Sequence, residues 1–191
     1  MSKHAREKVA EKAARMIVDG VETEYLYAKD RAIMMLGLDS MNHRPTNRRI
    51  KEYISMLTKC ELGEDEVARR LQEMRRIALD LMQILDEYDP FLIGSVLSGE
   101  IRKTSDIDLH AYSDNSMAVQ STLEVHGYDS VEEEVVNNQK GRFIHLKWKE
   151  LDYPVEITVY PWSWREKTLI SSVTGKAMKR CDQRGLLKLM Q

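Results

Sequence analysis

Apolar positions follow two different periods along the chain. In the first 88 residues they recur at spacings of three and four, the repeat of one helix face. One stripe consists of Val21, Tyr25, Ala28, Ala32 and Met35, and a later one of Val67, Leu71, Met74, Ala78, Leu81 and Leu85. Breaks at Gly37, at "NHRPTN" and at Gly63 predict about three helices, over residues 4–37, 46–60 and 64–87, with Gly20 a candidate bend in the first.

From Phe91 onward the runs shorten to strand length. "DIDLHAY" alternates, with Ile107, Leu109 and Ala111 on one face and Asp106, Asp108 and His110 on the other. "PVEITVYP" has the same pattern, with Val155, Ile157 and Val159 directed inward and Glu156 on the opposite face. "FLIG" and "RFIHLKWKEL" predict two further strands, "SMAVQSTLEVHG" a helix that ends at Gly127, and the tail a turn at Gly175 followed by a short helix.

These two patterns predict an α+β protein in three parts. Residues 1–88 form a helical region, residues 89–165 a core with a mixed β-sheet and flanking helices, and residues 166–191 a tail with a short helix. We therefore look for chemistry in the core, where polar side chains interrupt the apolar strands.

The acids of "DIDLH" are the first chemical signal. Residues i and i+2 of a strand project from one face, roughly 6 to 7 Å apart, so Asp106 and Asp108 would repel each other without a cation. Magnesium takes oxygen ligands, typically one or two carboxylates together with phosphate and water. Glu156 offers a third carboxylate if its strand lies beside "DIDLH". The alternative is a solvated strand face, and for Glu156 an exposed acid on an edge strand.

Gly94 and Ser95, at the end of the apolar "FLIG" run, are the second signal. A glycine lets backbone amides approach a phosphate closely, and a serine hydroxyl adds a donor. Together with the acids, this pair predicts a phosphate-binding turn beside a metal site.

The succession "LIGS", ten residues, "DIDL" and later "VEI" resembles the signature of the DNA polymerase beta superfamily of nucleotidyltransferases, in particular its small minimal members. The resemblance covers about residues 89–161. It implies a nucleotidyltransferase-type mixed sheet, with Gly94 and Ser95 contacting the terminal phosphates of the nucleotide. It also implies that Asp106 and Asp108 hold two magnesium ions, and that Glu156 completes the metal site and helps to activate the attacking hydroxyl.

The resemblance thus implies a magnesium-dependent enzyme. It would transfer a nucleoside monophosphate from a triphosphate, ATP being the expected one, to an unidentified hydroxyl and release pyrophosphate. Two positions depart from the family pattern. Ser98-Gly99 stands where many minimal members carry arginine and glycine, which leaves Arg102 or Lys103 as candidate basic contacts, and the third acid is glutamate rather than the commoner aspartate.

Composition narrows the partners. With 29 basic and 31 acidic residues the chain as a whole attracts no polyanion, so nucleic acid is not the favoured partner, and the arginines of the third helix (Arg69, Arg70, Arg75 and Arg76) are expected on a solvated face. The two cysteines, Cys60 and Cys181, are expected to be free thiols. Without an apolar signal or spanning segment, we expect a cytoplasmic protein with no membrane partner.

A second function remains open. The long apolar stripes of the helical region also suit an antitoxin-like or regulatory interaction protein, in which the nucleotidyltransferase core serves to bind a protein partner. Three further side chains lie near Glu156 in sequence and are candidates for contact with phosphate or acceptor: Arg142, His145 and Lys147. His110 shares the face of the aspartates, but we expect this single histidine to be a polar surface residue.

Overall fold

The computed structural model describes residues 2–138, 141–171 and 175–191. Contacts divide the chain into two compact units. The first holds residues up to 68 with segments from 100–104 and 170–176, and the second holds residues 69–99, 105–169 and 177–191. The boundaries that we predict after residues 88 and 165 stay predictions.

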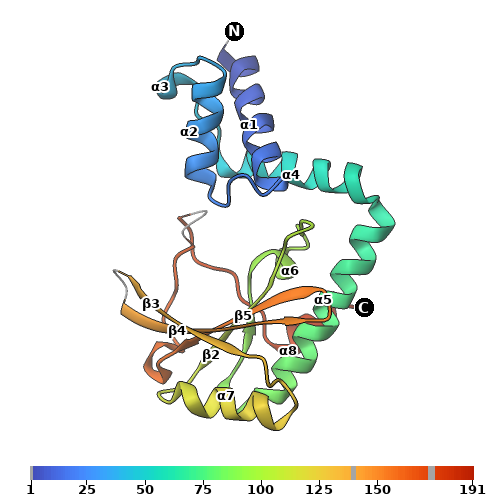
Figure 1. Cartoon of the computed structure of the whole chain (residues 1–191), viewed down its shortest axis with the longest axis vertical. Helices are drawn as coiled ribbons and strands as arrows, with labels where there is room; N and C mark the ends of the chain where they lie inside the picture. The colour runs from blue at the N-terminus through green and yellow to red at the C-terminus, as the bar shows by residue number, and fades with distance from the viewer. Residues whose placement is uncertain (1, 139–140, 172–174) are drawn as a thin grey trace. The chain divides into compact units, whose positions relative to one another are not determined.

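The first unit is helical. Its helices are α1 (Ser2–Val18), α2 (Tyr25–Met35), the short α3 (Ser40–His43) and α4 (Asn47–Leu62) (Figure 1). Small and branched apolar side chains form its core: Val9, Ala10, Ala13, Ala14, Ile17, Val18, Ala28, Ala32, Ile33, Ile50 and Ile54. Alanines at the contacts let the helices pack closely.

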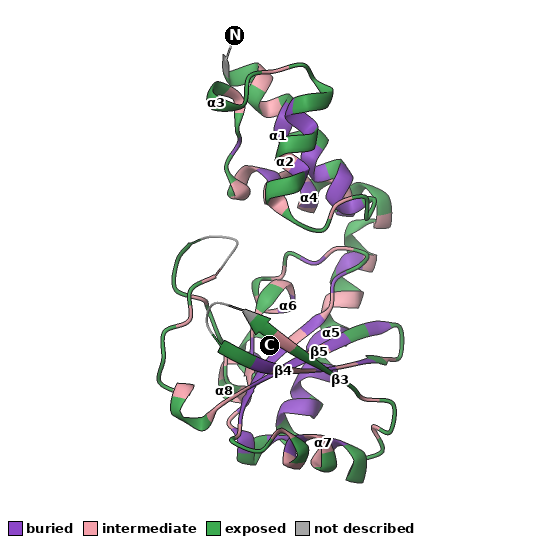
Figure 2. Ribbon diagram, turned by 60° about the vertical axis from the view of Figure 1, so that its left-hand side comes forward, coloured by how far each residue is buried: buried purple, intermediate pink, exposed green. Residues whose placement is uncertain are grey.

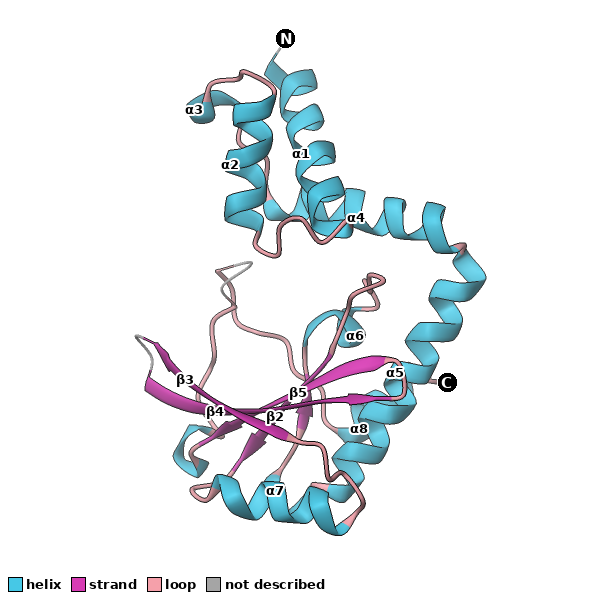
Figure 3. Ribbon diagram, viewed as in Figure 1, coloured by secondary structure: helices cyan, strands magenta, loops and turns pink. Residues whose placement is uncertain are grey.

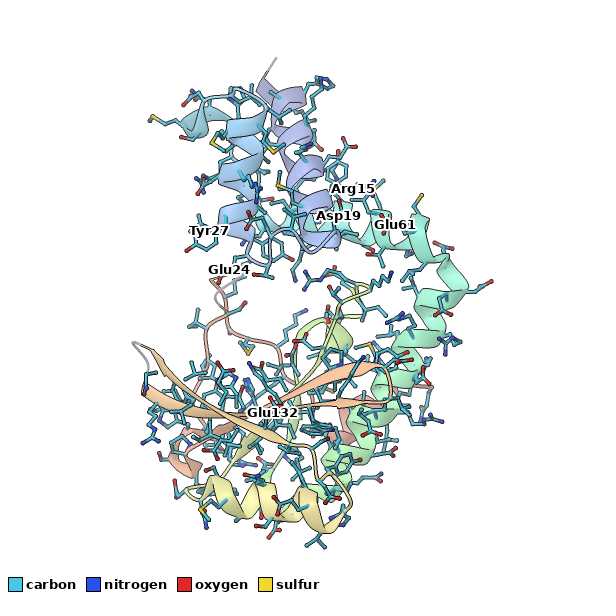
Figure 4. The ribbon with its side chains drawn as sticks, viewed as in Figure 1. Arg15, Asp19, Glu24, Tyr27, Glu61 and Glu132 are labelled. Atoms are coloured by element: carbon cyan, nitrogen blue, oxygen red, sulfur yellow. The ribbon has the colours of Figure 1, made fainter. Side chains whose placement is uncertain are left out.

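Polar contacts join α1 to α4 around this core. Arg49 donates from Nε to Glu7, 2.7 Å away, and the Tyr53 hydroxyl donates to the same carboxylate at 2.9 Å. Figure 4 labels a second pair, Arg15 of α1 and Glu61 of α4, whose nitrogen and oxygen lie 2.6 Å apart.

The predicted helix over residues 4–37 is wrong in one respect, because the structure divides it into α1 and α2. Gly20 has φ +71°, a left-handed conformation that ends α1. Val21 and Met35, which we assigned to one apolar stripe, are 52% and 56% exposed, whereas Ala28 and Ala32 are buried.

The second unit is a sheet with helices. Its five strands are β1 (Phe91–Leu92), β2 (Ile107–Tyr112), β3 (Glu132–Asn138), β4 (Gly141–Glu150) and β5 (Tyr153–Tyr160), in the order β1-β2-β5-β4-β3 (Figure 3). Only β2 and β5 run parallel; the other three pairings are antiparallel. A mixed sheet with flanking helices, preceded by a helical region, confirms the predicted α+β class.

Helices flank the sheet. They are the long α5 (Glu64–Ile84), the short α6 (Gly94–Ser98), α7 (Ser116–Val125) and α8 (Gln183–Leu189), with single 3-10 turns at Asp86–Tyr88 and Trp162–Trp164. Figure 1 shows α7 below the sheet. The predicted stripe of α5 is buried at Met74, Ala78 and Leu81, and at Leu85 directly after the helix. The expected helix at 116–127 and the final short helix are both present.

The core of this unit lies on one face of β2 and β5. Ile107, Leu109 and Ala111 are at most 1% exposed, and Val155, Ile157 and Val159 at most 4%. Figure 2 shows this burial as purple ribbon along the middle strands. The alternation therefore has the predicted direction, and the acids project from the opposite face.

The strand β3 is absent from our predictions. Its sequence, "EEEVVNN", is acidic and lacks an alternating apolar face, so the pattern carried no strand signal. It forms because β4 offers a free edge, and its first five residues are mostly exposed.

Cys60 and Cys181 are free, as expected. Cys181 exchanges both backbone hydrogen bonds with Leu92, each 2.9 Å long, and so extends the sheet beyond β1. Within the described ranges, no helix combines the length and apolar character that a membrane span requires.

The buried face of α7 supplies the first test. Leu123 is fully buried, whereas Val125 of the same helix is 84% exposed. Leu123→Ala is expected to lower the free energy of unfolding by about 2–5 kcal/mol through lost burial and a cavity, and Val125→Ala by less than about 0.5 kcal/mol. Urea denaturation followed by tryptophan fluorescence measures both, and equal losses would contradict the packing described.

Candidate active site

Pairing between β2 and β5 brings two of the predicted acids, Asp108 and Glu156, side by side. Asp106 directly precedes β2, Asp108 is its second residue, and Asp108 is the register partner of Glu156 in the neighbouring parallel strand. Each of the three is partly buried. Residues 108 and 156, separated by 48 positions in the chain, thus lie on one face at adjacent strands.

The Gly94-Ser95 turn lies against Asp108. A β-carbon at Gly94 would stand 2.2 Å from Oδ2 of Asp108, and Gly94 has φ +72°. Glycine is therefore required twice, for the backbone conformation and for the close approach of the carboxylate. The Ile93 amide also donates to the Asp108 carbonyl at 3.0 Å, which fixes the turn to β2.

Three serines and a glycine shape this turn. Ser95 donates from its hydroxyl to that of the buried Ser105, 3.1 Å away, and its carbonyl accepts from the Ser98 hydroxyl at 3.2 Å. Gly99 closes α6 with φ +79°. The Ser98 hydroxyl therefore ties the last residue of α6 back to Ser95. Arg102 and Lys103 group with the first unit.

A network of opposite charges surrounds Glu156. Its Oε1 lies 2.5 Å from His145 Nδ1, and its Oε2 lies 3.3 Å from Lys147 Nζ, which also donates to Glu134 at 2.5 Å. The hydrogen bond from His145 lowers the pKa of Glu156 despite the burial of the carboxylate. Glu156 is therefore ionised at neutral pH and bound to β4.

His110 lies on the same face as Asp108 but is buried, not at the surface as we expected: its side chain is 3% exposed. It is the register partner of Thr158, and its ring meets that of Tyr160 edge to face with centroids 4.8 Å apart. Burial, with Arg180 and His145 adding repulsion, lowers its pKa to about 4, against an opposing attraction from Glu156. The ring is thus neutral at pH 7.

Arg75 also departs from its expected place on a solvated helix face. It is 8% exposed and donates from Nε to the Val96 carbonyl of α6 at 3.2 Å and from Nη1 to the Leu189 carbonyl of α8 at 3.1 Å. Arg75 thus ties the glycine-serine turn to α5 and α8. Its place in a run of arginines gave no signal of this role.

The donor types fit magnesium, although three donors are not gathered. Asp106 and Asp108 match the one or two carboxylates that magnesium usually takes. The backbone at Gly94 lies too close to the Asp108 carboxylate for any side chain at position 94. Within the described parts of the chain, no three His, Cys, Asp or Glu side chains stand close enough to hold a metal ion. Glu156 is instead held by His145 and Lys147.

Known proteins offer limited comparison. No protein-family model matches the chain, and no curated protein is similar to it. Among solved structures, the chain is similar to Cid1 in complex with the UTP analog UMPNPP, with 24% identity over 47% of this chain and 30% of that one, at a TM-score of 0.35.

Two further Cid1 structures match to the same extent. One is described for its RNA terminal uridylyl transferase activity, with 20% identity over 48% of this chain and 30% of that chain at a TM-score of 0.36. The other is a mutant of the Cid1 poly(U) polymerase bound to MgATP, with 20% identity over 47% and 32% at a TM-score of 0.34. The chain spans about a third of their length.

Replacement of Gly94 by alanine tests the close approach. Gly94→Ala and Gly127→Ala both force a side chain into a positive φ, at +72° and +91°, and each is expected to cost about 1–3 kcal/mol of stability. Only Gly94→Ala displaces the Asp108 carboxylate, because nothing lies within 4 Å of a β-carbon at Gly127. Affinity for Mn²⁺, a magnesium probe read by electron paramagnetic resonance, should fall about tenfold or more in Gly94→Ala alone. An equal affinity in both variants would contradict this assignment.

The buried imidazole of His110 predicts a pH dependence of folding. Its pKa is about 4 in the folded chain against 6.5 for an ordinary histidine, so the unfolded state binds more protons between these values. Stability should therefore fall as pH drops from 6.5 to 4, by up to ~3 kcal/mol for this group. The pKa of Glu156 is also below its ordinary value, so protonation of this carboxylate lowers stability further as the pH drops below that value.

All three tryptophans lie in the second unit, so their fluorescence reports its unfolding. His110→Gln should flatten the dependence between pH 6.5 and 4 in EDTA-treated protein. The matched change at an exposed histidine, His4→Gln, should leave it as in the parent. An unchanged slope in His110→Gln would refute the effect of burial.

Proposed function

We propose that the protein is a magnesium-dependent nucleotidyltransferase that moves a nucleoside monophosphate, AMP from ATP in the first instance, to a hydroxyl acceptor. One observation carries the proposal: the parallel pairing of β2 and β5 sets Asp108 beside Glu156, with the glycine-serine turn against Asp108. A phosphate chain bound along Gly94 and Ser95 would therefore meet the carboxylates directly.

Each residue has a role in this reaction. Asp106 and Asp108 would hold magnesium, with Glu156 next to them as the third acid, and Gly94 and Ser95 would bind the terminal phosphates. When bound, magnesium supplies a lowered pKa for the acceptor hydroxyl and stabilises the leaving pyrophosphate. Two ions are expected, as in other two-metal phosphoryl-transfer sites.

The transfer exchanges one bond for another. The acceptor oxygen forms a bond to the α-phosphorus, the bond from that phosphorus to the bridging oxygen breaks, and pyrophosphate leaves with those electrons. The acceptor hydroxyl gives up its proton, which passes to solvent water. Glu156 is ionised at neutral pH because His145 donates to it, so it can accept a hydrogen bond from that hydroxyl and orient it.

The partners that we propose are a nucleoside triphosphate and an acceptor, in the cytoplasm. The alternative, an antitoxin-like interaction protein, is supported by apolar side chains that the first unit exposes: Leu26, Tyr27, Met34 and Met41 are 52–90% exposed. That alternative gives no reason for the juxtaposition of Asp108, Glu156 and Gly94. We therefore favour the enzyme.

Pyrophosphate release tests the proposal. The protein is incubated with ATP, magnesium and fractions of a cell lysate that supply acceptors, and pyrophosphate is measured. The double change Asp106→Asn with Asp108→Asn is expected to reduce release on the order of a hundredfold or more, because a metal contributes several kcal/mol to such a transition state.

The matched control is Asp129→Asn, an exposed aspartate in the loop between α7 and β3. It should retain the parent rate. Pyrophosphate release that is unaffected by chelation of magnesium, or equal in the double variant and in Asp129→Asn, would refute the proposal.

A further inference from the structure

A small recess includes His110, which follows Asp108 by two residues on β2. It is a cavity of about 90 Å³, several times the space that one water needs, lined by His110, Lys167, Thr168, Leu169, Met178 and Arg180. Five of these residues come from the segment after the second 3-10 turn, and His110 comes from β2. We call this recess the His110 cavity.

His110, the buried residue of the cavity, has one ring nitrogen without a hydrogen-bond partner among the described residues. Nδ1 of His110 is inaccessible, and no described residue bonds to it. A neutral imidazole carries one donor and one acceptor, and a buried polar group without partners is unfavourable. One nitrogen of a ring that lines the cavity thus has hydrogen-bonding capacity that the described residues leave unused.

The other polar members are cationic and well supported. Arg180 donates from Nη1 to the Tyr112 hydroxyl at 3.0 Å and to the Arg165 carbonyl at 2.8 Å, which uses only part of its five N–H groups. Lys167 Nζ lies 3.8 Å from the centre of the Trp164 ring. Two positive charges and the Thr168 hydroxyl thus border a small recess, which is the donor set that an oxyanion requires.

An aromatic stack holds the two sides of the cavity together. Trp164 stacks on Tyr160 at 5.7 Å between centroids, and Tyr160 meets the edge of His110. Lys167 above Trp164 and His110 against Tyr160 are therefore braced by one continuous set of rings. The segment that supplies most of the lining is thus packed, through these rings, against His110 of β2 and Tyr160 of β5.

Position relates the cavity to the reaction. His110 and Asp108 are two residues apart on one strand, a distance of roughly 6 to 7 Å, and Glu156 is close enough to act electrostatically on His110. A molecule with a hydroxyl at Glu156 would therefore reach the cavity with a group one short spacer away.

We propose that the His110 cavity binds an oxyanion, a carboxylate or a phosphate, that the acceptor carries one short spacer from its reacting hydroxyl. The claim that the anion belongs to the acceptor rests on the proposed function. Binding of an anion at the cavity can be measured without any turnover. Carboxylate and phosphate share this chemistry, because each is a compact oxyanion that Lys167 and Arg180 could contact together. Titration with one probe of each kind distinguishes them.

The test is an NMR titration of the whole chain in EDTA, without nucleotide, at constant ionic strength. Sodium phosphate is added in one arm and sodium acetate in the other, and the signals of His110 and Lys167 are followed. Saturable shifts in at least one arm are expected, and the arm that binds more tightly identifies the anion.

Two variants decide where the anion binds. Lys167→Gln should weaken binding about tenfold or more, because one charge-assisted contact is lost. Lys179→Gln changes an exposed lysine on the same segment that does not line the cavity, and it should bind as the parent does.

Shifts that are absent in both arms, or equally strong in Lys167→Gln, would overturn the inference. So would shifts abolished by Ser95→Ala and retained in Lys167→Gln, since the anion would then occupy the glycine-serine turn. Anion binding at the cavity without pyrophosphate release from ATP would contradict the proposed function only. Release without anion binding would remove the cavity assignment and leave the enzyme.

Discussion

The parallel pairing of β2 with β5 is the constraint on which the rest of the second unit depends. Side chains alternate across a strand, so the register that buries Leu109 against Ile157 also sets Asp108 beside Glu156 on the opposite face. A shift of one residue would turn the acids into the core. Burial of apolar side chains on one face of the sheet therefore determines which polar side chains lie together on the other face.

The two neighbouring acids of the site differ in their contacts. Glu156 has its counter-charges in the protein, from His145 and Lys147 on β4. The carboxylate of Asp108 lies against the backbone of Gly94, which has no side chain. The two neighbouring acids thus have different surroundings, which supports different roles: metal ligation by the aspartates and orientation of the acceptor by the glutamate.

Prediction from sequence succeeded where one local rule decided the structure. Alternation identified β2 and β5, and the helical repeat identified α5, because in each a single apolar face is buried against the core. It failed for β3, whose acidic run forms a strand only because β4 offers an edge. It also misplaced Arg75, since nothing in a basic helical run indicates which arginine will reach backbone carbonyls of α6 and α8.

The sequence by itself determined the α+β class, the inward faces of the central strands and the acids and glycine that are candidates for catalysis. These follow from periodicity and residue chemistry, which are local. Only the tertiary structure decided that Glu156 is the register partner of Asp108 and that His145 and Lys147 contact the Glu156 carboxylate. It also decided that His110 lines a cavity together with two cationic side chains. Those facts depend on which strands pair and in what register, a choice made by burial across the whole sheet.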